Sequence, residues 1–494
     1  MISKSKKAVL AVLCVLVIAL GVVLFAACNG LKWEGVGGGS PNSPTESQYG
    51  FVVKQGGYLY FINGYAGDVV ENDFGSQEKG AIVRVELDEK GNVKANTYKR
   101  VVPVVVYSTD KNTGFAVFGG YIYYAAPNTE KDKAGAPSTT DINIMRSKID
   151  GSSPEVLLTL TSRSYPYAFY SGAIVWHDST STSLYYADLN SGDKKKVSST
   201  VKVIAERVVE ARFVYGKTYS PGQDEKLSDF IYIAQSRPSE ESAFWYDYKA
   251  VKFDGSKSYT LINNLTYLPE GATDSKPYPE LTYQIKSVNH LYDEAAATLT
   301  LYYTKSVFFN QTTAARGVFY ANIAYEGGKP VFKKDTELKL AEDSATTTFD
   351  PVSYADGVLI NVNSNLFLIK GYADGTPNPN SFEKTDAIID GTPTVMYVLE
   401  NDLYYTSAST IYRLSLLDKT AVPKPITTKV VASTTWITYD RIGTKLYYFN
   451  TGDYSYVYVF DLSDPDGNRD EAVQLIGYRN AADQTAYDEA HADD

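Results

Sequence analysis

Residues 445–464 read KLYYFNTGDYSYVYVFDLSD, two runs of aromatic and β-branched residues with a polar turn between them. Such runs favour β-strands joined in a hairpin. The first run, KLYYFN, is one copy of a recurring strand in which a turn residue precedes an aliphatic residue and an aromatic pair. Eight copies of this strand begin at Tyr58, Tyr121, Ala173, Phe230, Leu299, Gly357, Asp402 and Lys445.

Each copy is preceded by a shorter apolar strand and followed by a third strand, a polar turn cluster and a fourth strand. The turn clusters lie at 88–91, 150–151, 190–192, 254–255, 326–328, 374–375, 418–419 and 464–467. From Asp88 to Asp464 there are 464 − 88 = 376 residues over seven intervals, or about 54 per unit, which is typical of propeller blades. An immunoglobulin-like array would need about 100 residues per unit. The sequence therefore predicts an all-β fold, a single β-propeller of four-stranded antiparallel blades, with eight blades favoured and seven as the alternative.

The first and last units each contain four strand-like runs of their own. We therefore expect no strand exchange between them, and a ring that closes by side-chain packing.

The composition limits which molecules are expected to bind the predicted propeller. The chain has 494 residues with 42 Tyr but 20 Phe and 4 Trp, a profile that favours exposed or half-buried β-sheet. Without the three lysines of the N-terminus, 47 − 3 = 44 basic residues face 58 acidic ones, a charge of about −14. Nucleic acid and an anionic bilayer surface are therefore poor partners for the folded body.

The stretch from Met1 to Cys28 indicates a targeting segment. Three lysines at positions 4, 6 and 7 precede an uncharged stretch, AVLAVLCVLVIALGVVLFAA, which ends at Ala27. Cys28 follows two small residues and opens a polar stretch, an arrangement that resembles the bacterial lipobox and implies a lipidated N-terminal cysteine. The alternative is an uncleaved transmembrane anchor, since about 20 apolar residues span a bilayer. Both interpretations place the body on the extracellular side of a bacterial cell membrane.

Two further segments flank the predicted propeller at residues 49–478. Residues 29–48, NGLKWEGVGGGSPNSPTESQ, are rich in Gly, Ser and Pro and predict a flexible tether. Residues 479–494 are acidic, lack a strand pattern and predict a disordered tail. Since the two cysteines are Cys14 and Cys28, no disulfide is expected in the exported part.

The repeats resemble those of bacterial surface lipoproteins with Tyr-rich propellers, which are similar to the propeller of low-density-lipoprotein-receptor-related proteins. The resemblance is carried by IYY with IMRSKIDGS near residue 144, by LYYTSASTIYRLSLLD at 403–418 and by KLYYFNTGDYSYVYVFDLSD. It spans roughly Tyr49 to Tyr478. The receptor-type Tyr-Trp-Thr-Asp signature is absent, and the segments most similar to it are VWHD at 175–178 and LYYT at 403–406. The resemblance implies architecture and surface location but no activity.

Catalytic and metal motifs are scarce. The three histidines, His177, His290 and His491, stand in no HExxH or HxH pattern, and no P-loop, GxSxG or GxGxxG occurs. Asp464, Asp466, Asn468 and Asp470 have the alternate spacing of a calcium loop, but the twelfth position is Leu475, where a bidentate Glu is needed. We interpret this cluster as a hairpin turn with calcium as the weaker alternative, and we expect no cofactor.

These observations favour a non-catalytic binding or scaffolding module for another surface protein or a cell-envelope glycan. The alternative is an exported propeller enzyme of the glycosidase or lyase type, whose carboxylate pair cannot be identified among 58 acidic residues.

Loop lengths indicate a working face. We call the end of the ring with the first-to-second and third-to-fourth strand connections the turn face, because only Tyr215–Asp229 is long there. The opposite end, the loop face, carries the long stretches 65–80, 127–141, 236–242, 264–280 and 306–317. Long loops on one side of a repeat protein often form its binding face, although neutral insertions are the alternative. The binding candidates are Tyr65, Phe74, Tyr278, Phe308 and Phe309.

Overall fold

The computed structural model describes most of the predicted propeller. It covers residues 43, 45–47, 50–63, 71–72, 75–76, 80–102, 106, 114–128, 140–214, 217–219, 224–236, 246–262, 281–293, 298–309, 312–341, 352–354, 357–362, 365–370, 383–390, 394–407, 410–418, 421–427, 439–450, 453–463 and 471–473.

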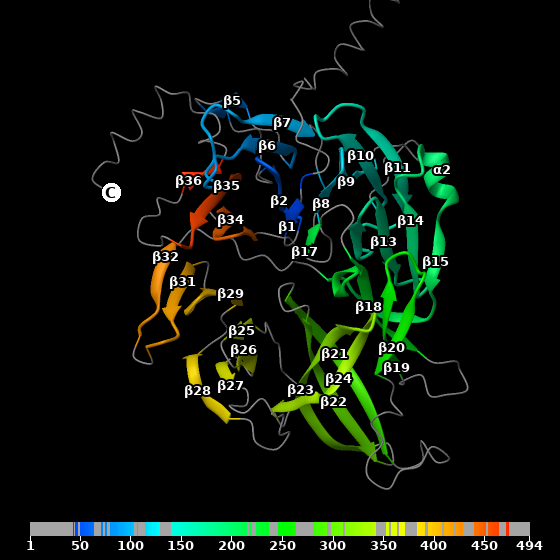
Figure 1. The fold of residues 1–494 in the computed structure, drawn as a ribbon, viewed down its shortest axis with the longest axis vertical. Helices are drawn as coiled ribbons and strands as arrows, with labels where there is room; N and C mark the ends of the chain where they lie inside the picture. Colours follow the sequence, from blue (N-terminus) through cyan, green and yellow to red (C-terminus); the bar gives the residue numbers. More distant parts are fainter. Residues whose placement is uncertain are drawn as a thin grey trace, which may run out of the picture.

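The described strands form antiparallel sheets that follow one another around a ring (Figure 1). We number the sheets in chain order. Sheet 1 has six strands, in the order β17 (Lys217–Tyr219), β1 (Thr45–Ser47), β2 (Val52–Gln55), β3 (Tyr58–Ile62), β6 (Ile82–Glu86) and β7 (Lys99–Val102). Sheet 2 contains β8 (Phe115–Phe118), β9 (Tyr121–Pro127), β10 (Ile142–Lys148) and β11 (Glu155–Leu160). Sheet 3 contains β12 (Tyr167–Tyr170), β13 (Ala173–Asp178), β14 (Ser183–Asp188) and β15 (Lys202–Ala205).

The remaining sheets have four strands each. Sheet 4 contains β16 (Val208–Arg212), β18 (Phe230–Ser236), β19 (Tyr246–Lys252) and β20 (Ser258–Ile262), and sheet 5 contains β21 (Leu281–Asp293), β22 (Thr298–Phe309), β23 (Thr312–Glu326) and β24 (Lys329–Ala341). Sheet 6 contains β25 (Val352–Tyr354), β26 (Gly357–Val362), β27 (Asn365–Lys370) and β28 (Glu383–Asp390). Sheet 7 contains β29 (Thr394–Leu399), β30 (Asp402–Ser407), β31 (Thr410–Ser415) and β32 (Lys424–Thr427), and sheet 8 contains β33 (Tyr439–Ile442), β34 (Lys445–Asn450), β35 (Asp453–Asp461) and β36 (Glu471–Ala472). A small hairpin, β4 (Glu71–Asn72) with β5 (Gly75–Ser76), lies between β3 and β6.

The recurring strand is the second strand of each four-stranded unit, as the sequence predicts; in sheet 1 this unit is β2, β3, β6 and β7. The eight strands are β3, β9, β13, β18, β22, β26, β30 and β34, and each begins within one residue of its expected start. Each pairs antiparallel with the strands before and after it in its sheet. The all-β propeller class, with four-stranded antiparallel sheets as its unit, is confirmed.

The Tyr-Tyr pairs serve two interfaces between neighbouring sheets. Tyr123 and Tyr124 are adjacent in β9, so their side chains leave opposite faces of sheet 2. Tyr123 packs in a cluster with Phe169 of sheet 3, whereas Tyr124 belongs to a cluster with Phe61 of sheet 1. The expectation of exposed or half-buried tyrosine is wrong for this pair, because both faces of sheet 2 are covered by a neighbouring sheet. The largest fully buried side chains include Tyr60, Tyr123, Tyr124, Tyr167, Tyr232, Tyr404, Tyr447 and Tyr448.

Sheets 8 and 1 close the ring by packing and by one buried carboxylate. Ile442 and Tyr447 of sheet 8 share a core cluster with residues of sheets 1 and 2. Asp440 on β33 is fully buried, and its Oδ2 accepts hydrogen bonds from the backbone N–H groups of Phe51 (3.2 Å) and Val52 (3.1 Å). Among the described strands, none from the N-terminal part pairs within sheet 8. Side chains therefore join the ends of the ring, in agreement with the expected absence of strand exchange.

Asp and Gly recur in the turn clusters for two reasons. The Asp side chain accepts a backbone hydrogen bond, and Gly adopts a positive φ. Asp150 Oδ1 accepts from the backbone N–H of Ser152 at 2.8 Å, and Gly151 has a φ of 83°. The same Asp-x-Ser contact recurs at Asp254 and Ser256. These side chains fold the turn locally, as Asx-turns do.

The connection that follows the turn cluster at 190–192 contains a helix that was not predicted from the sequence. α2 (Lys194–Ser199) lies in the third-to-fourth connection of sheet 3, so the turn face has a second long connection. The helix begins because Asp193 Oδ1 accepts from Lys196 N–H at 3.0 Å, and it is held by burial of Val197.

Candidate functional site

The inner edge of sheet 1 carries two strands beyond the usual four. β1 pairs antiparallel with β2, with Thr45 opposite Gln55, and on its other side with β17, with Thr45 opposite Tyr219. β17 comes from a distant part of the chain, the long first-to-second connection of sheet 4. Both strands lie toward the middle of the ring (Figure 1). Two segments that are distant in sequence therefore extend sheet 1 toward the middle of the ring.

β1 joins sheet 1 to sheet 2 and to a connection of sheet 4. Thr45 is buried, and its Oγ1 donates to the carbonyl oxygen of Val117 in sheet 2 at 3.0 Å. Glu46 forms an ion pair with Lys54 of β2 at 3.1 Å. The predicted tether at residues 29–48 is thus too long at its C-terminal end, because Thr45–Ser47 form a strand of the folded body. These residues form a strand because they pair with β2 on one side and with β17 on the other. Local composition alone does not predict this pairing.

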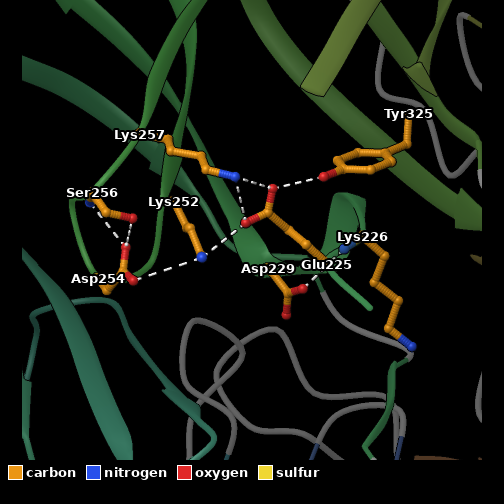
Figure 2. Close-up of polar contacts among 8 residues, drawn as sticks. All are labelled: Glu225, Lys226, Asp229, Lys252, Asp254, Ser256, Lys257 and Tyr325. Carbon is orange, nitrogen blue, oxygen red and sulfur yellow. Dashed lines mark hydrogen bonds and ion pairs between the residues drawn. The ribbon is translucent and has the colours of Figure 1, made fainter. Parts of the chain in front are cut away.

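The connection that carries β17 is anchored by an ionic cluster around Glu225 (Figure 2). Lys257 Nζ lies 2.9 Å from Glu225 Oε1, and Lys252 Nζ lies 2.8 Å from Oε2. The Tyr325 hydroxyl at the end of β23 donates to Glu225 Oε1 at 2.6 Å. The carboxylate therefore joins its own connection to the turn of sheet 4 and to sheet 5.

Backbone and turn contacts complete the cluster. Lys252 also approaches Asp254 Oδ2 at 3.7 Å, and Ser256 N–H donates to Asp254 Oδ1. The short helix η1 (Leu227–Asp229) follows Glu225, and Asp229 Oδ2 accepts from the Lys226 N–H at 2.9 Å. These bonds shape the connection between Glu225 and β18.

The electrostatics keep Glu225 ionised. Burial alone would raise the pKa of this carboxyl, but hydrogen bonds from Lys252, Tyr325 and Lys257 outweigh it and lower the pKa to about 2. The pKa of Lys252 is raised, first by its hydrogen bond to Glu225. Burial and the hydrogen bond to Glu225 raise the pKa of Tyr325. A carboxylate with so low a pKa is an acceptor of hydrogen bonds and a poor proton donor, so the cluster acts as a clamp.

Most of the sequence-predicted site residues lie outside the described residues. These are the lipidation candidate Cys28, the binding candidates Tyr65, Phe74 and Tyr278, and the calcium candidates Asp464, Asp466, Asn468 and Asp470. The pairing of β4 with β5 places a small hairpin within residues 65–80, where the sequence predicts a loop.

Phe308 and Phe309 lie in a strand and not in the expected loop. β22 continues to Phe309, where it pairs with Leu281 of β21 and Thr312 of β23. The prediction of a loop at 306–317 is therefore wrong. The aromatic and β-branched residues on both sides of this turn favour continued pairing over an irregular loop. The two phenylalanines remain at the loop-face end of sheet 5.

His177 has a structural contact. Its side chain is buried, and its Nε2 lies 3.0 Å from the carbonyl oxygen of Val208 on the first strand of sheet 4. Burial lowers the pKa of His177, so the neutral ring joins sheets 3 and 4. His290 lies in β21. His491 falls outside the described residues.

The described residues offer no support for a metal site or for a membrane-spanning helix. They contain no group of three or more His, Cys, Asp or Glu side chains arranged to hold a metal ion. Within the same residues no helix has the length and apolar character needed to cross a membrane. The apolar segment that precedes Cys28 lies outside the described residues.

Comparison with known proteins found structural similarity at low identity. No family model and no curated protein sequence matches the chain. The propeller domain of the Trilobed protease from Pyrococcus furiosus is 10% identical, with a TM-score of 0.34 over 77% of this chain and 98% of that one. Apo AztD from Citrobacter koseri is 12% identical, with a TM-score of 0.37 over 84% of this chain and 94% of that one. A prolyl endopeptidase is 12% identical, with a TM-score of 0.38 over 78% of this chain, which spans 50% of that protein. The fold assignment rests on this chain's own strand pairing and packing.

Proposed function

We propose that this protein is an eight-bladed propeller lipoprotein, held through a lipid on Cys28 at the outer side of a bacterial cell membrane. In this proposal it acts as a non-catalytic binding or scaffolding module for another surface protein or a cell-envelope glycan. The N-terminal sequence supports the anchor, since a basic start and an apolar run precede Ala26, Ala27 and Cys28.

The observation that best supports a scaffolding role is that two carboxylates, Asp440 and Glu225, join neighbouring parts of the ring. Asp440 accepts from the backbone N–H groups of Phe51 and Val52 and, through Oδ1, from that of Arg441. Glu225 is bound by two lysines and a tyrosine. Such contacts make a rigid frame, on which variable connections can present a binding surface.

Sheet 5 adds a projecting element to the loop face. Its second strand has 12 residues, whereas the second strand of sheet 4 has 7. Five extra residues at about 3.3 Å each extend the hairpin by roughly 16 Å. Register places Phe308 and Phe309 at the far end of this extension. We propose this hairpin, together with the connections that contain Tyr65, Phe74 and Tyr278, as the binding surface.

Capture from an envelope extract tests the binding face. The mature protein is immobilised, and bound protein and glycan are identified together by mass spectrometry. One variant carries Phe308→Ser with Phe309→Ser, and a second carries Tyr65→Ser, Phe74→Ser and Tyr278→Ser. The matched control replaces Leu417 and Val422 by Ser, because these side chains are 72% and 82% exposed and belong to a connection on the turn face.

We expect the loop-face variants to lose capture with little change in thermal unfolding, while the control retains it. Loss in the control with full capture by both loop-face variants would show that the opposite face binds. Hydrolysis or cleavage of a captured glycan by the parent protein would replace the scaffolding proposal by an enzymatic one.

The anchor is tested separately. Cys28→Ser should release the folded body from the membrane fraction or mislocalise it without unfolding it. If this variant stays fully membrane-bound and the parent keeps the segment from Met1 to Ala27, an uncleaved transmembrane segment replaces the lipid anchor.

A further inference from the structure

We infer that the N-terminal segment leaves the ring at the turn face, so that the anchored propeller holds its turn face toward the bilayer and its loop face away from it. This inference rests on the proposed membrane anchor. It adds an orientation that neither the N-terminal sequence nor the loop lengths contain.

Strand direction provides the first argument. β2 ends at Gln55 and is followed by the Gly56-Gly57 turn, which is a first-to-second connection and therefore lies on the turn face. β1 is antiparallel to β2, with Thr45 opposite Gln55. The chain thus enters β1 at the turn face and runs toward the loop face. Everything that precedes Thr45 must reach the ring from the turn-face side.

The position of Ser43 provides a second argument. A Cβ built on Gly56 would lie 3.1 Å from Ser43 Oγ, so Ser43 sits against the turn itself. Gly56 has a φ of +57°, a conformation that glycine adopts without strain. The last described residue before β1 therefore lies beside the outermost point of a turn-face connection.

The exit point is held firmly near the axis. β1 is flanked by two strands, and Thr45 bonds to Val117 in the next sheet. Release of the segment would break pairing on both edges and expose a buried hydroxyl. The pull of an anchor is therefore transmitted to the centre of the turn face, not to its rim.

Chain length makes the opposite orientation unfavourable. Residues 29–42 number 42 − 28 = 14, and a coil of that length spans roughly 20 Å. To bring the loop face to the bilayer, the segment would have to cross four strands, roughly 15–20 Å, and then follow the strand length, roughly 20 Å. Such a path approaches the fully extended length of about 48 Å and loses most of the coil's conformational entropy.

Fluorescence quenching in vesicles tests the orientation. The lipidated full chain, in a Cys14→Ala background, is reconstituted into vesicles of equal phosphatidylcholine and phosphatidylglycerol that contain a headgroup nitroxide quencher. One variant carries a probe at Glu89→Cys, in the third-to-fourth connection of sheet 1 on the turn face. Its matched partner carries the probe at Ser179→Cys, in the second-to-third connection of sheet 3 on the loop face. Both native side chains are exposed.

We expect the Glu89→Cys probe to be quenched at least roughly twice as strongly, since the two positions differ by about one strand length along the axis. Equal quenching, or stronger quenching at Ser179→Cys, would overturn the inference. Vesicle flotation keeps the two proposals apart. A parent protein that fails to float contradicts the membrane anchor, whereas one that floats with the wrong quenching order contradicts the orientation alone.

A third variant tests the role of β1. Glu46→Pro places proline in a strand paired on both edges, where it removes a ladder N–H. Added to both probe backgrounds, it should reduce the quenching difference while the protein still floats. Ser40→Pro, outside β1, should leave the difference intact. An undiminished difference in the Glu46→Pro background would show that β1 does not set the orientation.

Discussion

The ring closure at Asp440 permits a quantitative test of how this propeller is held together. Asp440→Ala removes the acceptor of three backbone N–H groups, and two of these, those of Phe51 and Val52, belong to fully buried residues. Because both residues are fully buried, solvent is poorly placed to replace the lost acceptor.

The expected cost follows from the number of orphaned donors. Each unsatisfied buried N–H costs about 1–3 kcal/mol, so two cost about 2–6 kcal/mol. Asp440→Asn retains one carbonyl oxygen of nearly the same shape and should cost about half as much. Against a total stability of about 5–15 kcal/mol, the alanine change removes a large fraction.

Asp88 supplies a matched control in the same chain. Its Oδ1 also accepts from two backbone N–H groups, those of Lys90 and Asn92, each at 2.8 Å, but its turn is exposed. Because water replaces the lost acceptor, Asp88→Ala should cost no more than about 1 kcal/mol.

Urea unfolding followed by tryptophan fluorescence gives the free energies. We expect the order parent, Asp88→Ala, Asp440→Asn, Asp440→Ala from most to least stable. Equal midpoints for Asp440→Ala and Asp88→Ala would refute the claim that this carboxylate closes the ring.

Three further outcomes follow from the described contacts. Glu225→Gln should lower stability by about 1–2 kcal/mol at pH 7 after solvent screening. Because the folded pKa of Glu225 is about 2, against an ordinary 4.5, this difference should vanish as pH falls through that window, as measured by denaturant midpoints. The pKa of His177 lies below its ordinary 6.5, so the unfolded chain binds the proton first and the parent should lose stability as pH falls below 6.5. His177→Gln should show a shallower slope in the same titration, and an unchanged slope would contradict the assignment. Thr45→Val should cost about 1 kcal/mol through the lost bond to Val117 and hasten proteolysis near residue 45, and equal proteolysis rates would count against a firmly held β1.

Local patterns were sufficient for strands whose sheet is buried on both faces, as sheet 2 is. A strand such as β9, with Ile122, Tyr123 and Tyr124 in succession, has a strong apolar signal at every position. The turn at Asp150 is equally local, since its hydrogen bonds reach only two residues ahead. Both features were therefore predicted from sequence.

Local sequence patterns did not predict the structure where the residues fit two kinds of structure about equally well, a strand or a loop in one segment and a helix or a turn in the other. The segment around Phe308 contains both strand-forming residues and polar spacers, and only pairing with Leu281 and Thr312 on either side continues β22. The six residues of α2 are too few for a clear helical period, and burial of Val197 decides their conformation.

The sequence by itself determined the class of fold, the place of each recurring strand and the N-terminal expectation of an anchor, because these depend on residues close together in the chain. Tertiary structure decided which segments extend sheet 1 toward the middle of the ring and how the ring closes. β1 and β17 are too short for a periodic signal, and they pair although β1 precedes sheet 1 and β17 belongs to a connection of sheet 4. Asp440 meets Phe51 across 389 positions. The long connection at 215–229 is evident from the sequence. The ionic cluster around Glu225 is not, because the residues that bind Glu225 come from separate strands and turns. Such contacts gain their free energy only after the sheets have come together, so no local pattern records them.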